Sequence, residues 1–235
     1  MLNVNGLEAA YGTNQVLFGI DLSVDDGEVV TLLGRNGMGK TTTINTVLGI
    51  VPARSGDVQF DGTALRLLGA YRIARLGIGL VPEGRQVFPN LTVYENLIAT
   101  SANRRGAANP WTLERIYAMF PELQSRRSSM ANLLSGGEQQ MLAIGRALMT
   151  NPKFLILDEA TEGLAPMVRA EIWSCLKALK EEGLSILVVD KNVADLVAFA
   201  DRHVIIEKGQ VVWTGSSAEL GQDQDLQHRY LGVGD

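Results

Sequence analysis

The sequence is poor in several features that mark particular classes of protein. Its 235 residues include one cysteine, Cys175, which excludes an internal disulfide and is typical of a reducing compartment. No apolar run approaches the ~18 residues of a membrane-spanning helix, and the opening MLNVNGLEAA lacks the segments of a signal peptide. The 26 acids outnumber the 21 bases, which argues against a dedicated nucleic-acid binder. We therefore expect a cytoplasmic protein that has no transmembrane segment and does not bind nucleic acid.

Short apolar runs that end in glycine, proline or charge are the main structural signal. Four of them are typical of strands buried on both faces of a sheet: EVVTLL, IGLVP, FLILD and SILVVD (28–33, 78–82, 154–158 and 185–190). Near the N-terminus the turn YGTNQ separates two further strands, with alternating apolar residues at Leu2, Val4, Val16, Phe18, Ile20 and Leu22. HVIIEKGQVVWTG (203–215) indicates a hairpin around Lys208-Gly209.

From about residue 89 to 150 the pattern becomes helical. LTVYENL predicts a capping box with Thr92 as N-cap and Glu95 three residues on, and NPWTLERIYAMF predicts a helix capped by Asn109 with Pro110 as its first residue. We therefore expect one α/β domain over 1–235, with a core (1–88 and 151–235) that includes an N-terminal antiparallel β subdomain. A helical subdomain of about 89–150 is inserted in it.

GRNGMGKT, residues 34–41, directly follows one of these strands and matches G-x-x-x-x-G-K-[ST] in full. Its glycines let backbone N–H groups converge on phosphate oxygens at the start of a helix. Lys40 is expected to reach the β- and γ-phosphates of a nucleotide, and the Thr41 hydroxyl to coordinate Mg²⁺. A chance glycine-rich turn is the alternative. The strand-then-helix context favours a nucleotide site formed by Gly34, Arg35, Asn36, Gly37, Met38, Gly39, Lys40, Thr41 and Thr42.

FLILDE, residues 154–159, is an apolar strand that ends in two carboxylates. Asp158 is placed to hold the magnesium ion through water, and Glu159 to polarise the attacking water as a general base. Paired acids after a strand are common on solvated surfaces, but downstream of a P-loop they favour catalysis.

LSGGEQQ, residues 134–140, distinguishes between classes of P-loop protein. A Ser-Gly-Gly turn that opens a helix offers a hydroxyl and free N–H donors to an anion, through Ser135, Gly136 and Gly137. Ser135 also predicts an N-cap with Glu138 completing its capping box, which is compatible with anion binding. The heptapeptide resembles the signature of the ABC-type ATPases, which other P-loop families do not carry.

The resemblance extends over nearly the whole chain. Tyr11 matches the aromatic residue that stacks on adenine, although a core tyrosine is the alternative, and VPEGRQVFPNLTVYENL matches the segment that couples the nucleotide site to a membrane partner. DEATEGLAP and the ending HRYLGVGD are similar to the ATP-binding subunits of branched-chain amino acid importers. The resemblance implies a P-loop NTPase fold and Mg·ATP hydrolysis between two head-to-tail subunits. Each site would take its P-loop from one subunit and Ser135–Gly137 from the other.

Three positions depart from the pattern usual in that family. Glu83 stands where glutamine is normal as a Mg²⁺ ligand and γ-phosphate sensor, with Gln86 three positions on as the alternative sensor. Ala165 replaces an aspartate of the dimer contact. Lys191 replaces a histidine that bonds the γ-phosphate, and lysine offers three donors, a full charge and no acceptor. We expect Lys191 to contact the γ-phosphate or pair with Glu159, favouring its ionised form; the alternative is a solvated Lys191 neutralised by Asp190 or nearby acids.

The resemblance thus implies an ATPase subunit that powers a membrane importer of branched-chain amino acids, on the inner face of the membrane. Its partners are permease subunits and a second ATPase subunit, which is the same chain or, more usually in this importer family, a longer paralogue. The alternatives are a urea or amide importer, a soluble ABC ATPase of repair or translation, and a weakly hydrolysing regulatory subunit. The soluble class usually carries two cassettes or long inserts, and this sequence has neither. No residue in it identifies the transported substrate.

Overall fold

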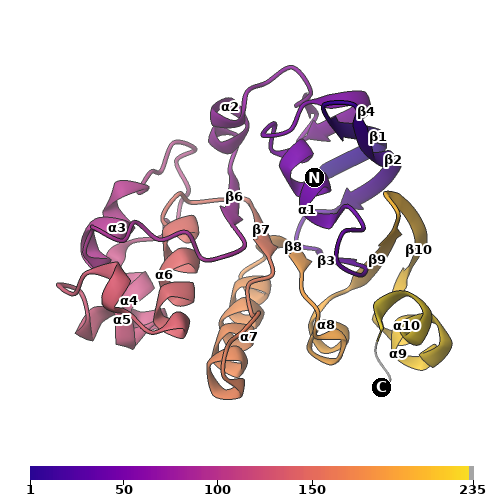
Figure 1. Ribbon diagram of the computed structural model, residues 1–235. Coiled ribbons are helices and arrows are strands. Elements are labelled where there is room, and N and C mark those ends of the chain that lie inside the picture. Colours follow the sequence, from indigo (N-terminus) through magenta and orange to yellow (C-terminus); the bar gives the residue numbers. More distant parts are fainter. Residues whose placement is uncertain (233–235) are drawn as a thin grey trace.

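The structure is a computed structural model that describes residues 1–232, and a six-stranded sheet forms its centre (Figure 1). The strand order is β10-β9-β3-β8-β7-β6, and all strands except β10 run parallel. Their bounds are β3 (Val29–Leu33), β6 (Ile78–Val81), β7 (Phe154–Asp158), β8 (Ser185–Val189), β9 (Arg202–Glu207) and β10 (Gln210–Ser216). The four apolar runs and the hairpin at Lys208-Gly209 are confirmed as strands.

A second, antiparallel sheet has the order β2-β1-β4-β5. It contains β1 (Leu2–Tyr11), β2 (Asn14–Val24), β4 (Ala53–Phe60) and β5 (Thr63–Ala64). The alternation expected in β2 fails at Phe18, whose side chain is 46% exposed. A register shift at Gly19 (φ +90°) inserts one extra residue, so Leu17 is buried in place of Phe18.

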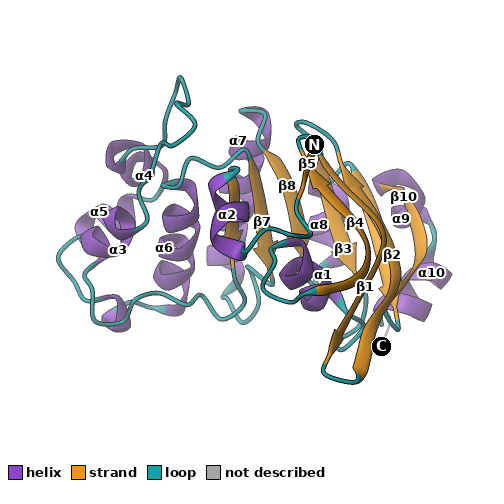
Figure 2. Ribbon diagram, turned by 90° about the horizontal axis from the view of Figure 1, so that it is seen from above, coloured by secondary structure: helices purple, strands orange, loops and turns teal. Residues whose placement is uncertain are grey.

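The strands of the central sheet are buried on both faces and divide their side chains between two cores. Val29, Leu155 and Ile186 pack with the helices on one face, whereas Val30, Ile156 and Leu187 face the antiparallel sheet. Helix α1 (Lys40–Val47) lies between the two sheets (Figure 2). This burial explains why the strands read as continuous apolar runs rather than as alternating patterns.

Helices α3 to α6 gather at one side of the molecule, beyond β6 (Figure 1). The helices are α2 (Ala70–Arg75), α3 (Val93–Ala99), α4 (Leu113–Met119), α5 (Pro121–Ser125), α6 (Gly136–Leu148), α7 (Pro166–Glu181), α8 (Val193–Phe199), α9 (Ser217–Gln222) and α10 (Gln224–Leu231), with a 3₁₀ turn at Ala131–Leu133. Among the described residues, none of these helices combines the length and apolarity needed to cross a bilayer. The division of the chain at residues 88 and 150 remains our proposal.

Two expected helix starts have different outcomes. The capping box of Thr92 and Glu95 is confirmed, because each side chain bonds the other's backbone N–H. The start at Asn109 and Pro110 is wrong, since α4 begins at Leu113 and Thr112 caps it. The intervening segment is held out of the helix by tertiary contacts: Asn151 accepts from the Trp111 N–H at 2.6 Å. The thiol of Cys175 is buried.

The buried His203 on β9 predicts how the free energy of unfolding depends on pH. Its ring is fully buried, with Nδ1 2.7 Å from the Thr31 hydroxyl and Nε2 2.8 Å from that of Ser217. Burial lowers the pKa of His203 from 6.5 to about 4, so protons bind the unfolded chain more readily than the folded one. The neutral ring is therefore expected to contribute up to about 3 kcal/mol to the free energy of unfolding. This contribution is fully present above pH 6.5 and is lost as the pH falls toward 4. Denaturant unfolding of the wild type and His203→Gln between these pH values checks this; equal pH slopes would contradict it.

Candidate nucleotide site

The carboxyl ends of β3, β7 and β8 meet at one edge of the central sheet, and a cavity of about 460 Å³ lies there. Residues far apart in the sequence line it: Val16, Asn36, Gly37, Gly39, Lys40, Thr41, Thr42, Glu83, Glu159, Glu162 and Lys191. Ligands of open α/β sheets bind at this edge. The structure therefore brings the P-loop, the acids after β7 and the lysine after β8 to one site.

The P-loop owes its shape to glycines with backbone angles that other residues avoid. Gly34 has φ +142°, and a side chain there would collide with the Ile206 carbonyl. Lys40 is buried, and its ammonium donates to the carbonyls of Gly34 (2.9 Å) and Arg35 (3.2 Å). Burial lowers the pKa of Lys40, whereas the negative charges of Glu159 and Asp158 raise it. Lys40 thus spans the loop, with its charge held at the cavity wall.

The carboxylates form an acidic cluster opposite the P-loop. Oxygen atoms of Glu83, Glu159 and Glu162 lie within 4.8 Å of one another. Asp158 is buried, and its Oδ1 has no hydrogen-bond partner among the described residues. Burial raises the pKa of Asp158, whereas the Thr41 hydroxyl lowers it. An unpartnered buried carboxylate oxygen beside a threonine hydroxyl suits a hard divalent cation.

Glu159 has the properties expected of a general base. Its backbone adopts φ +51°, uncommon for a non-glycine residue, and its N–H donates to the Val189 carbonyl at 2.8 Å. Burial, followed by the neighbouring Glu162, raises the pKa of Glu159 to about 7. Lys191 lowers this pKa, as its charge predicts, but the burial and the second carboxylate outweigh it.

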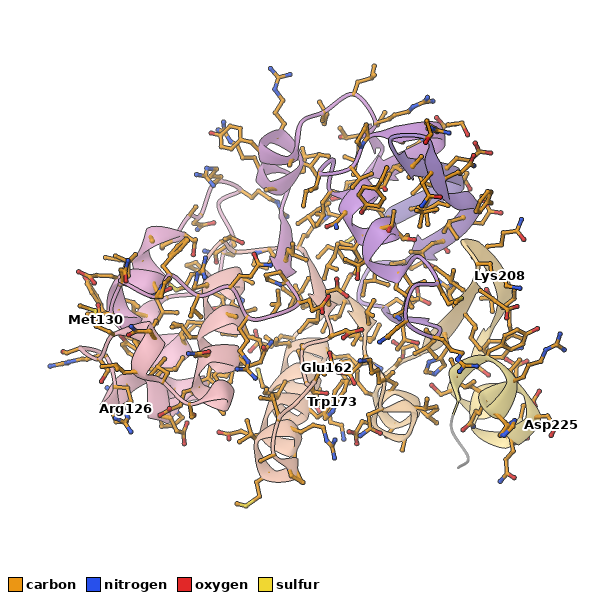
Figure 3. The ribbon with its side chains drawn as sticks, in the orientation of Figure 1. Arg126, Met130, Glu162, Trp173, Lys208 and Asp225 are labelled. Atoms are coloured by element: carbon orange, nitrogen blue, oxygen red, sulfur yellow. The ribbon has the colours of Figure 1, made fainter. Side chains whose placement is uncertain are left out.

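Lys191 pairs with two acids of the cavity. Its ammonium donates to Glu162 and lies 3.5 Å from a Glu159 oxygen. The Glu162 hydrogen bond is the largest cause that raises the pKa of Lys191. Figure 3 shows Glu162 near the centre of the molecule, away from Arg126 and Met130 of the helical segment. Glu162 was missed from the sequence, although it lies only three residues after Glu159.

Asp190 does not neutralise the Lys191 ammonium. Its buried carboxylate accepts from the hydroxyl (2.6 Å) and the N–H (3.2 Å) of Thr161, and from the N–H groups of Lys191 (2.7 Å) and Asn192 (3.1 Å). This carboxylate joins the loop after β7 to the loop after β8. The contact between Asp190 and Thr161 was also missed, because the two residues are distant in sequence.

The two candidate sensors face different cavities. Glu83 lines the nucleotide cavity, whereas Gln86 lines a separate groove and donates from its side chain to the Glu83 carbonyl at 3.2 Å. The geometry favours Glu83 as the residue that faces a nucleotide-bound metal.

Some proposed site residues lie outside the cavity lining. Tyr11 is 52% exposed at the end of β1, and Gly34, Arg35 and Met38 line neighbouring hollows. Ser135–Gly137 open α6, on the far side of β6 and β7 from α1 (Figures 1 and 2). The expected capping box of Ser135 and Glu138 is confirmed. Of the ending HRYLGVGD, residues 233–235 lie outside the described residues.

This fold and cavity define a P-loop nucleotide-binding protein. Comparison with known proteins narrows the class: residues 17–162 match the family model described as ABC transporter. The chain is 38% identical to the high-affinity branched-chain amino acid transport ATP-binding protein BraG of Pseudomonas aeruginosa, over 99% of this chain and 100% of that protein. It is 36% identical to the lipopolysaccharide export system ATP-binding protein LptB of Escherichia coli, over 98% and 97%.

Solved structures agree with this result. A nucleotide-free ATP-binding cassette from an ABC transporter matches with a TM-score of 0.85 and 25% identity, covering 100% of this chain and 99% of that one. A dimeric, post-hydrolysis cassette bound to ADP and phosphate matches with a TM-score of 0.80 and 25% identity, over 92% and 99%. The chain belongs to the ABC transporter family and is an ATPase subunit of that family, as its signature indicated.

Proposed function

We propose that this chain powers a membrane importer of branched-chain amino acids, as one of two ATPase subunits on the inner face of the membrane. The observation that carries the proposal is the identity to BraG over the full length of both chains, together with the sequence DEATEGLAP after β7. The second subunit is a further copy or, as usual in this importer group, a longer paralogue.

Within each site, Lys40 holds the β- and γ-phosphates of ATP and Glu159 takes a proton from the attacking water. A pKa near 7 leaves Glu159 able both to accept that proton and to release it afterwards. The unpartnered Asp158 oxygen, the Thr41 hydroxyl and Glu83 would hold Mg²⁺, which neutralises phosphate charge when bound. Ser135, Gly136 and Gly137 of the second subunit complete the site from the opposite side.

The cargo is tested through the permease. Purification of the chain with its native membrane subunits, followed by reconstitution into liposomes with the matching binding protein, should give ATP-dependent uptake of labelled leucine. The identity to LptB makes lipopolysaccharide export the second candidate. Membrane subunits that extract lipopolysaccharide and transport no leucine would replace the first proposal with the second, and uptake of urea would select the amide importer.

We expect the Lys191 ammonium to interact with both Glu162 and the γ-phosphate, and this shared interaction should slow hydrolysis. We expect Lys191→Ala to weaken ATP affinity by about tenfold, since it removes a charge-assisted hydrogen bond to the phosphate. Lys191→His should restore affinity and raise turnover above the wild type, because neutral imidazole offers an acceptor and frees Glu162. Nucleotide titration and steady-state phosphate release measure both quantities. Turnover and affinity unchanged in both variants would contradict a phosphate contact.

A further inference from the structure

One buried carboxylate, that of Asp190, holds the loop after β7 and the loop after β8 together. One of its oxygens accepts from the hydroxyl (2.6 Å) and the N–H (3.2 Å) of Thr161. The other oxygen accepts from the N–H groups of Lys191 (2.7 Å) and Asn192 (3.1 Å). Asp190 and Thr161 are only 7% and 4% exposed, so both side chains are shielded from water. The Asp190 carboxylate is therefore a buried bridge between two loops of the nucleotide cavity.

The bridge has a strict chemical requirement, because all four of its partners are hydrogen-bond donors. A carboxylate presents only acceptors to them. Asparagine has the same size but offers one oxygen and an NH₂ group, which would face two of the four donors. Buried donors that lose their acceptors are costly. Asp190→Asn should therefore loosen the bridge without changing the volume of the side chain.

Thr161 lies two residues after Glu159, so the bridge acts on the loop that carries the proposed general base. Glu159 has φ +51° and donates its N–H to the carbonyl of Val189, the residue before Asp190, at 2.8 Å. Backbone in this region persists only where the surroundings fix it. The end of β8 thus holds this loop at two points, at Glu159 itself and at Thr161.

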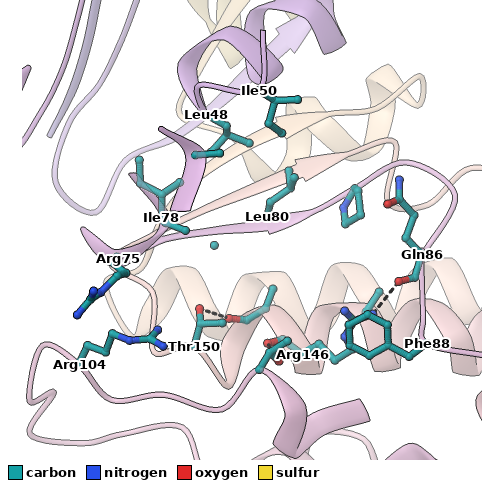
Figure 4. A pocket seen from close by; sticks show the side chains of 18 of the residues that line it. Leu48, Ile50, Arg75, Ile78, Leu80, Gln86, Phe88, Arg104, Arg146 and Thr150 are labelled. Carbon is teal, nitrogen blue, oxygen red and sulfur yellow. Dashed lines mark hydrogen bonds between the residues drawn. The ribbon is translucent and has the colours of Figure 1, made fainter. Parts of the chain in front are cut away.

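The third carboxylate of the cavity, Glu83, is held from another side. Arg146 of α6 donates to the Gln86 carbonyl at 2.7 Å (Figure 4), and the Gln86 side chain donates to the Glu83 carbonyl at 3.2 Å. Arg146 and Gln86 line the separate groove outside the nucleotide cavity. A change at Asp190 should therefore displace the loop of Glu159 and leave Glu83 in place.

We propose that Asp190 is a positioning residue for hydrolysis: by binding Thr161 it keeps the Glu159 carboxylate within reach of the attacking water. Asp190 itself does not line the nucleotide cavity. A general base has to lie within hydrogen-bond distance of its water, so a small displacement of the loop is costly. Lys191 stands on a flexible four-carbon stem and can still reach a phosphate after such a displacement. The proposal rests on the role of Glu159 in the proposed function.

Two substitutions break the bridge from opposite ends, Asp190→Asn and Thr161→Val. In the full chain with its native partner subunits, each should lower turnover at saturating ATP by about tenfold or more. ATP affinity should change less than about threefold, since the phosphate contacts remain. Thr31→Val is the matched control: it removes another buried hydroxyl, which lies 2.7 Å from His203 and outside the cavity lining. Its turnover should stay within about twofold of the wild type at a similar loss of unfolding free energy.

Combination with Glu159→Gln separates positioning from a general structural role. If Asp190 acts through Glu159, adding Asp190→Asn should change the residual turnover of Glu159→Gln by less than about twofold. Thr161→Val provides the same comparison if Asp190→Asn does not fold. Release of radiolabelled phosphate measures the residual activity, and denaturant unfolding measures the stability of each variant.

Three results would overturn the proposal. They are equal fold-losses of turnover with and without Glu159→Gln, equal losses in Thr161→Val and Thr31→Val, and a loss of ATP affinity as large as the loss of turnover. Full turnover in Glu159→Gln alone would overturn the base assigned in the proposed function. A large loss in that variant, with an equal further loss from Asp190→Asn, overturns the positioning role alone. None of these measurements depends on the cargo.

Discussion

Glu159→Gln is expected to reduce steady-state ATP hydrolysis by roughly 10²–10³-fold while leaving ATP bound. Glutamine keeps the size of the side chain but cannot accept the proton of the attacking water. The substitution also removes one of three crowded carboxylates, Glu83, Glu159 and Glu162, and so reduces repulsion of the γ-phosphate. An ATP-bound dimer that cannot hydrolyse should therefore accumulate. Phosphate release measures the first effect, and light scattering after size exclusion in ATP measures the second.

Glu162→Gln is the matched control for that experiment. It removes a carboxylate from the same cluster, and the carboxylate most closely paired with Lys191, but leaves the proposed base in place. We expect a change in turnover of less than about tenfold, because the group that takes the proton from the attacking water is retained. Equal losses in the two variants would assign the effect to the charge of the cluster. Unchanged turnover and no trapped dimer in Glu159→Gln would favour the regulatory, non-hydrolysing alternative.

The parts of the site that the sequence predicted are those encoded by contiguous residues. GRNGMGKT directly follows a strand, and FLILDE contains a strand end followed by the groups that act there. Because parallel strands end at one edge, these segments had to meet once they formed one sheet. Lys191 followed from the same rule, as the second residue beyond β8.

The remaining features depend on contacts between distant residues or on burial. The pairing of Lys191 with Glu162 and the link from Asp190 to Thr161 join loops 29 residues apart. The pKa of Glu159 rises because burial exceeds the attraction of Lys191, a balance that no motif specifies.

Local signals also failed where a stronger contact competed. Asn109 and Pro110 have good helix-start chemistry, yet Asn151 holds the Trp111 N–H and the helix starts at Leu113. At Thr92 and Ser135 the capping boxes form as expected. The N–H groups of Val93 and Tyr94 at the start of α3 donate to the Ser129 and Arg127 carbonyls, and these tertiary hydrogen bonds are compatible with the cap. Propensity therefore predicted helix starts where the tertiary contacts left the capping geometry intact.

Ser135→Asp and Lys40→Ala should both abolish hydrolysis, but through different subunits. Lys40 lines the cavity of its own chain, whereas Ser135 caps α6, a helix that lies beyond β6 and β7 from α1. We therefore expect Lys40→Ala to weaken nucleotide binding by the lone chain at least about tenfold. Ser135→Asp should leave that affinity unchanged, yet lower hydrolysis by roughly 10²-fold or more, because its carboxylate would face phosphate across the dimer. Ser135→Asn is the control, since asparagine caps a helix equally well without adding charge.

Mixing the two inactive chains tests whether each site is shared. A mixed dimer has one site with both defects and one in which wild-type Lys40 faces wild-type Ser135. If this chain pairs with itself, an equal mixture should recover up to about a quarter of wild-type turnover, since half of the dimers are mixed and one of two sites in each is intact. Recovery in the mixture, with neither chain active alone, would show that the signature acts in trans. Loss of nucleotide affinity in Ser135→Asp itself would contradict a shared site and place Ser135 beside its own P-loop.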